Sequence, residues 1–108
     1  MNALDAELVF EPVDASQVVE GAPTTGETVL SDLGGSEIGV WEMTAGAMSD
    51  TEVDEVSVVV AGSATIEFLD SGQVLEVGVG DVLHFAAGDR TIWRVPERIR
   101  KVYVVPTA

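Results

Sequence analysis

Short runs of alternating apolar and polar residues make up most of the chain, and turn-forming residues separate them. From residue 28 onward the apolar positions follow a period of two, which is typical of β-strands, and Gly, Pro or Asp interrupts them at roughly ten-residue intervals. We expect strands at residues 40–44, 55–61, 64–69, 73–77, 82–85, 91–95 and 99–105. No stretch after residue 20 keeps the 3.6-residue period of a helix. The pattern therefore predicts an all-β sandwich or barrel rather than a β-α-β fold.

The first 27 residues differ from the rest of the chain. They are rich in Ala, Glu, Pro and Thr, and the sequence of residues 21–26 is typical of a loop. We expect residues 1–27 to be a loosely structured lead-in that packs on the outside of the domain, with a short strand at residues 8–10. Residues 28–108 are then expected to form one domain, because nothing in them indicates a linker.

The composition fits one small domain with a substantial core, since the chain has 108 residues and is 46% hydrophobic. No apolar run approaches the roughly 18 residues needed to span a bilayer. The first five residues lack the basic and apolar regions of a signal peptide. Cysteine is absent, so neither disulfides nor thiolate chemistry is available. We expect a cytoplasmic protein.

The charge is strongly negative and unevenly distributed. The formal net charge is −14, from 19 acidic and 5 basic residues. Because such a surface repels phosphate backbones and anionic lipids, we expect neither a nucleic-acid nor a membrane partner. The cations either pair with acids on neighbouring strands, form an anion-binding mouth, or face an acidic edge of a second subunit. All of them follow residue 89: Arg90, Arg94, Arg98, Arg100 and Lys101.

Two local motifs occur in an informative order and spacing. In the first, Asp54 and Glu55 are followed after six residues by Gly62. In the second, the run Gly-Asp-Val-Leu-His-Phe-Ala-Ala-Gly at residues 80–88 is followed by Thr91. Together they resemble the two conserved motifs of the cupins, in which a glutamate precedes a glycine by this spacing and a Gly-Asp strand ends in a turn.

The residues around these motifs sharpen the resemblance. Trp41, Trp93 and the run Arg-Lys-Val-Tyr-Val at residues 100–104 are similar to one cupin branch. That branch includes (S)-ureidoglycine aminohydrolase, the ethanolamine-utilisation protein Q and many small single-domain proteins of unknown function. The resemblance covers residues 38–105. It implies an RmlC-like cupin fold, a jelly-roll β-barrel that is also described as a double-stranded β-helix.

The resemblance also implies a metal held by three histidines and a glutamate, and the chain departs from that pattern. Glu55 stands at the glutamate position. The histidine positions carry Met48, Asp50 and Thr91, or Ser49, Thr51 and Thr91 if the spacer is one residue shorter. With one histidine and no cysteine, the chain cannot supply three such ligands from one subunit. We therefore expect no transition metal and no other cofactor.

Glu55 is the candidate catalytic residue. Alternation places it on the inward face of its strand together with Ser57 and Val59, and a carboxylate in a partly apolar lumen can act as an acid or a base. The alternative is a structural carboxylate that hydrogen-bonds to Thr91, a tyrosine or an arginine. A ligand in the lumen would contact Trp41, Met48, Asp50, Ser57, Arg90, Thr91, Trp93 and Tyr103, where the tryptophans either stack on it or simply fill the core.

The acidic run before the first motif is a second candidate site. On an extended chain Asp50, Glu52 and Asp54 share one face and Glu55 lies on the other. A site for a hard cation such as Mg²⁺ would therefore be split. We expect this run to be a solvated loop.

The remaining polar candidates lie in and after the second motif. Arg90 and Arg94 flank Thr91, so they either capture an anionic ligand at the barrel mouth or pair with surface acids. His84 shares a strand face with Val82, and we expect an exposed imidazole on the less apolar face.

Three functions stay open at this point. The first is binding of a small molecule in the lumen without a transition metal. The second is a metal-independent enzyme that uses Glu55, with His84 or Tyr103, for proton transfer on a small amino or carboxylate metabolite. The third is a scaffold whose lumen is packed shut by Met48, Val59, Phe85 and the two tryptophans. In each case we expect a homodimer, because unpaired edge strands need cover.

Overall fold

The computed structural model describes residues 1–107 and contains strands but no helix in that range. The expected all-β class is therefore confirmed, and residues 1–107 hold no helix long and apolar enough to cross a bilayer. The strands are β1 (Glu11–Pro12), β2 (Val18–Glu20), β3 (Thr24–Leu33), β4 (Ser36–Thr51), β5 (Glu55–Phe68), β6 (Val74–Gly78), β7 (Val82–Phe85) and β8 (Arg90–Pro106).

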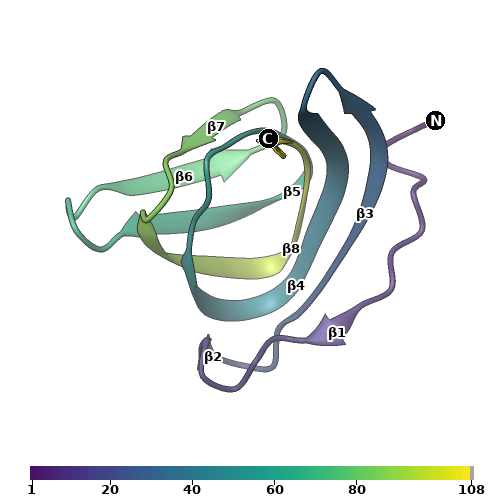
Figure 1. Ribbon diagram of the computed structural model, residues 1–108. Coiled ribbons are helices and arrows are strands. Elements are labelled where there is room, and N and C mark those ends of the chain that lie inside the picture. Colours follow the sequence, from purple (N-terminus) through teal and green to yellow (C-terminus); the bar gives the residue numbers. More distant parts are fainter. Residues whose placement is uncertain (108) are drawn as a thin grey trace.

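All pairings are antiparallel and join the strands into one rolled sheet. The order is β1-β3-β4-β8-β5-β6, with β2 paired to β4 and β7 paired to β5. Figure 1 shows the sheet curling around a central space, with β3 and β4 along one side and β5, β6 and β7 along the other. Strand β8 pairs with β4 on one edge and with β5 on the other, so it joins the two sides. This arrangement is the expected jelly-roll barrel.

The long strands are bent rather than interrupted, which differs from the expected boundaries. Residues 55–61 and 64–69 belong to the single strand β5 apart from Leu69, and residues 91–95 and 99–105 both belong to β8. The register shifts at the bends, as between Val59 and Ala61 and between Gly62 and Thr65. Gly62 has a φ of +73°, and a Cβ there would lie 1.9 Å from the carbonyl oxygen of Arg98. Glycine thus marks a bend where two strands approach closely.

Apolar side chains fill much of the barrel interior. Met43, Ile66 and Ile99 are fully buried, and Phe85 and Trp93 are buried beside them. The ring centroids of Phe85 and Trp93 are 5.8 Å apart, and those of Trp41 and Trp93 are 5.3 Å apart with an edge-to-face orientation. These contacts hold the indole rings of Trp41 and Trp93 in their orientations, and both rings also border a pocket in the barrel.

The N-terminal segment contacts the sheet, but not through the predicted strand at residues 8–10. Residues 11–12 form β1 instead, and β3 already begins at Thr24. The segment is held by the buried guanidinium of Arg100, which donates hydrogen bonds to the carbonyl oxygens of Ala3, Leu4 and Ala6. Val9 is 81% exposed. An apolar triplet was therefore a misleading signal, because a charged side chain of β8 anchors the segment.

Candidate functional site

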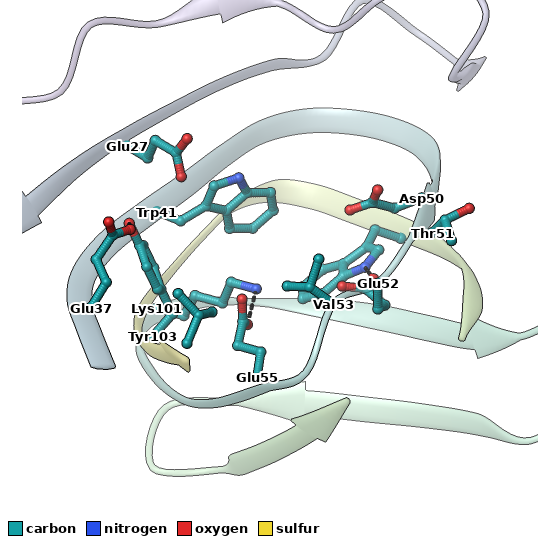
Figure 2. A pocket seen from close by; sticks show the side chains of 12 residues that line it. Glu27, Glu37, Trp41, Asp50, Thr51, Glu52, Val53, Glu55, Lys101 and Tyr103 are labelled. Carbon is teal, nitrogen blue, oxygen red and sulfur yellow. Dashed lines mark hydrogen bonds and ion pairs between the residues drawn. The ribbon is translucent and has the colours of Figure 1, made fainter. Parts of the chain in front are cut away.

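The inward faces of β4, β5 and β8 enclose a pocket of about 260 Å³ above the packed core. Trp41 and Trp93 form its aromatic wall, and Val53 and Val105 add apolar surface. Its polar lining consists of Glu27, Glu37, Asp50, Thr51, Glu52, Glu55, Lys101 and Tyr103. Figure 2 shows these groups arranged around the Lys101 ammonium. The lumen is thus filled only in part, contrary to the expectation for a packed scaffold.

A buried ion pair lies at the centre of the site. The Lys101 ammonium donates a hydrogen bond to Glu55 Oε2 at 2.7 Å, and the lysine side chain is 6% exposed. Its Nζ lies 4.7 Å from the ring centroid of Trp41, 4.9 Å from that of Trp93 and 5.5 Å from that of Phe85. A desolvated ammonium is stabilised electrostatically both by a carboxylate partner and by the faces of aromatic rings. Glu55 is therefore held by a lysine rather than by the threonine, tyrosine or arginine that the sequence suggested.

Lys101 was not among the predicted site residues, because it was grouped with the basic run. A signal was present, since the alternation of β8 places Lys101 on the same face as Ile99 and Tyr103. Those two residues are buried as well.

Glu52 is the second buried carboxylate of the pocket. It, rather than Glu55, is the hydrogen-bond partner of Thr91. Its Oε2 accepts hydrogen bonds from Thr91 Oγ1 at 2.6 Å and from Trp93 Nε1 at 3.0 Å. The alternative in which Glu55 hydrogen-bonds to Thr91 is therefore wrong. The reason is local: residues 52–54 leave the strand geometry, and the backbone of Glu52 pairs with Gly88 and Asp89.

The irregular segment at residues 52–54 also changes which acidic side chains share a face. The expected grouping of Asp50, Glu52 and Asp54, with Glu55 on the opposite face, is wrong. Asp50, Glu52 and Glu55 all face the pocket, whereas Asp54 lies outside it. Asp54 accepts a hydrogen bond from the backbone N–H of Ala87 at 2.8 Å. Strict alternation fails here because the chain between β4 and β5 is not extended, so the run is not merely a solvated loop.

The pocket is electrostatically negative, because five carboxylates face one ammonium. Burial, and then the negative charge of Glu52, raises the pKa of Asp50 from 3.8 to about 6. Burial together with the nearby Glu27 and Glu37 also raises the pKa of Tyr103. The Tyr103 hydroxyl therefore stays protonated and donates a hydrogen bond to Glu37 Oε2 at 3.2 Å.

The other predicted ligand contacts divide into those that line the pocket and those that do not. Trp41, Asp50, Trp93 and Tyr103 line it together with Glu55. Thr91, Met48 and Ser57 are buried outside its lining. The Ser57 hydroxyl has no hydrogen-bond partner within residues 1–107.

The arginines do not form a mouth for this pocket. Arg90 pairs with Asp70 and Arg94 pairs with Glu67, and all four side chains are at least one-third exposed. They point outward because Thr91 and Trp93, at the alternate positions of β8, point inward. Placing Arg90 among the ligand contacts in the lumen was therefore wrong, and surface pairing is what the structure shows. His84 is exposed, as expected.

The side chains at the family's metal positions do not fit a transition-metal site. Met48 is packed in the core, Glu55 is bonded to Lys101, and Thr91 donates to Glu52. Across residues 1–107 no three His, Cys, Asp or Glu side chains are grouped so that they could hold a metal ion. The positive charge inside this barrel belongs to Lys101.

Comparisons with known proteins agree with this architecture. The family model of the EutQ-like cupin domain matches residues 30–103. No curated protein matches the chain.

Solved structures that are similar to it include the following three. A protein of unknown function from Pseudomonas syringae shares 25% identity at a TM-score of 0.81, covering 96% of this chain and 46% of that one. A putative ethanolamine utilization protein Q from Salmonella typhimurium shares 20% identity at a TM-score of 0.67, covering 94% and 97%. The EutQ protein of Clostridium difficile shares 22% identity at a TM-score of 0.67, covering 80% of this chain and 64% of that protein, which is less than two thirds of its length. Since the family model spans most of the sequence and the resemblance seen in the motifs is confirmed, the chain belongs to the family of EutQ-like cupin domains.

Proposed function

We propose that this cupin binds a small organic cation, such as a primary amine, in the pocket of its barrel without the help of a transition metal. The observation that carries the proposal is the charge of the lining. Five carboxylates face the pocket, and its one ammonium, Lys101, is already paired with Glu55. A positively charged ligand would relieve the remaining repulsion, whereas an anion would add to it.

The aromatic wall supports the same ligand class. Trp41 and Trp93 lie within about 5 Å of the Lys101 ammonium, so their faces already accommodate one cation. Trp41 is only half-buried, which leaves indole surface for a second cation.

The size of the pocket suits a small metabolite. A volume of about 260 Å³ holds roughly eight or nine water-sized groups at ~30 Å³ each. The net charge of −14 adds a long-range field that raises the local concentration of cations.

An enzymatic role is the second candidate, and one observation favours it in an altered form. The pKa of Asp50 near 6, which results from burial and the charge of Glu52, suits a group that exchanges protons near neutral pH. Glu55 is occupied by Lys101. We therefore propose Asp50, rather than Glu55, as the acid or base of any proton transfer in this pocket.

Isothermal titration calorimetry tests the proposed function at pH 7.5 with three probes that have the same three-carbon chain length. The probes are propylamine, the neutral 1-propanol and the anionic propionate. We expect saturable binding for propylamine only, and a weakening of about fivefold or more in Glu37→Gln, because one attractive charge is lost at short range. Glu76→Gln, which removes an exposed carboxylate of β6 outside the pocket, serves as the matched control. Binding of propionate in preference to propylamine would contradict the proposal.

A further inference from the structure

The Lys101 ammonium has more hydrogen-bond donors than the protein uses. An ammonium carries three N–H groups, and one of them is donated to Glu55 Oε2 at 2.7 Å. Within residues 1–107 no other acceptor bonds to Nζ, whose remaining neighbours are the rings of Trp41, Trp93 and Phe85. The side chain is more than nine-tenths buried and yet lines the pocket. A ligand atom in the pocket can therefore accept a hydrogen bond from it.

The charges around Lys101 decide which kind of acceptor fits. Glu55 is bonded to the ammonium, and Asp50 and Glu52 face the same pocket. A carboxylate or phosphate of the ligand would be repelled by these carboxylates, because the single ammonium does not neutralise their charge. A neutral oxygen, as in a hydroxyl, ether or amide, accepts the hydrogen bond without that repulsion.

The acidic residues at the other side of the pocket give the ligand its second contact. Figure 2 shows Glu27 and Glu37 on one side, apart from the central Lys101–Glu55 pair. Glu37 is oriented by the Tyr103 hydroxyl, while Glu27 comes from the neighbouring strand β3. An ammonium placed near these two carboxylates leaves the opposite end of a short ligand beside Lys101.

We infer that the ligand is bifunctional: its ammonium group faces Glu27 and Glu37, and a neutral oxygen at its other end accepts a hydrogen bond from Lys101 Nζ. This inference rests on the proposed function and adds the specificity-determining residue. Lys101 selects ligands that carry an oxygen over hydrocarbon amines of the same size. The carboxylates select the positive charge.

Two isosteric amines test this selection. Butylamine and 2-methoxyethylamine have the same number of non-hydrogen atoms and differ by one ether oxygen in place of a methylene. Calorimetric titrations at pH 7.5 give the ratio of their dissociation constants in the wild type and in Lys101→Met, whose side chain has a similar length but no donor. We expect the wild type to bind 2-methoxyethylamine about tenfold more tightly, as for a hydrogen bond to a charged donor. In Lys101→Met we expect the ratio to fall to one or to reverse.

The outcomes separate the two proposals. If both amines bind the wild type with equal affinity, or if Lys101→Met keeps the preference, the inference about Lys101 is wrong while amine binding stands. If neither amine binds the wild type, the proposed function fails and the inference fails with it. If Lys101→Met does not fold because Glu55 is left unpaired, the ratio is measured in Glu55→Met/Lys101→Met, which removes both charges, adds no hydrogen-bond donor and is read by the same criteria.

Discussion

Lys101 and Glu55 stabilise each other because each would otherwise be a buried charge without a partner. Both side chains are close to nine-tenths buried or more, and their atoms are 2.7 Å apart. Removing one partner of such a pair costs far more than removing both. Loss of either partner alone is therefore expected to destabilise the barrel.

The ion pair gives the first prediction. Lys101→Met and Glu55→Gln are each expected to lower the free energy of unfolding by about 3 kcal/mol, because each leaves a buried group unsatisfied. The double variant should lose much less than the sum of the two. Urea titrations of the four proteins measure this coupling. Asp70→Asn, which breaks an exposed pair with Arg90, is the control and should leave the stability unchanged. Additive effects of the two buried substitutions would contradict the account.

Asp50 gives a prediction about pH. Burial and the charge of Glu52 raise its pKa from 3.8 to about 6 in the folded protein. The folded state therefore holds this proton more tightly than the unfolded state, and the ionised carboxylate destabilises the fold increasingly as the pH rises from about 4 through 6. Asp50→Asn should raise the free energy of unfolding at pH 7.5 by about 1 kcal/mol, a figure discounted for partial exposure.

The same substitution should have much less effect at pH 4, where Asp50 is protonated in the folded state. Urea titrations of both proteins at the two pH values test this difference. A stabilisation that is equal at pH 4 and pH 7.5 would show that the carboxylate charge is not its cause.

At the scale of the elements, the sequence predicted the strands well and their ends poorly. The alternating pattern located residues in β4 to β8 correctly, but Pro96 and Gly62 were taken as strand ends although both lie inside long strands. Glycine and proline indicate a change of backbone direction, and in a small barrel that change is a bend that keeps its hydrogen bonds on both sides. The pattern alone does not distinguish a bend from a turn.

The pocket residues that were predicted lie on strands, whereas Glu52, which was not among them, lies where the backbone is irregular. Glu55 lies on a regular strand, so alternation placed it on the inward face, whereas Trp41 and Trp93 were candidates because of the cupin resemblance. Glu52 lies in the irregular segment between β4 and β5, where alternation gives no information, and it was assigned to a solvated loop. Glu52 and Glu55 both find their partners on β8, which is distant from them in the sequence.

The bend at Gly62 gives a prediction at this scale. A Cβ at this position would lie 1.9 Å from the Arg98 carbonyl oxygen, and φ is +73°. Gly62→Ala should therefore lower the free energy of unfolding by about 3 kcal/mol or more, through both the steric clash and the strained backbone.

Gly72→Ala is the matched control, because Gly72 has a φ of +76° but nothing within 4 Å of the added Cβ. It should cost only about 1–2 kcal/mol, from the backbone alone. Thermal and urea unfolding of the two variants give the comparison. Equal losses would mean that the close approach of β5 and β8 at Gly62 does not constrain the barrel.

At the scale of the whole molecule, the excess of acids works against compactness. All five cations are engaged in ion pairs within residues 1–107, yet the net charge remains −14. Raising the NaCl concentration from 0.02 to ~0.5 M shortens the Debye length several-fold and screens this repulsion. We expect the melting temperature to rise by about 5 °C. A melting temperature that falls with added salt would mean that the ion pairs outweigh the repulsion.

The negative pocket is the central claim, and the indole resonances of the chain's two tryptophans report on it directly. Trp41 and Trp93 both line the pocket. We predict that titration with propylamine at pH 7.5 shifts the indole N–H signals saturably in a ¹H–¹⁵N correlation spectrum, while propionate leaves them in place. Signals that move with propionate, or that stay fixed throughout the propylamine titration, would contradict an organic-cation site in this barrel.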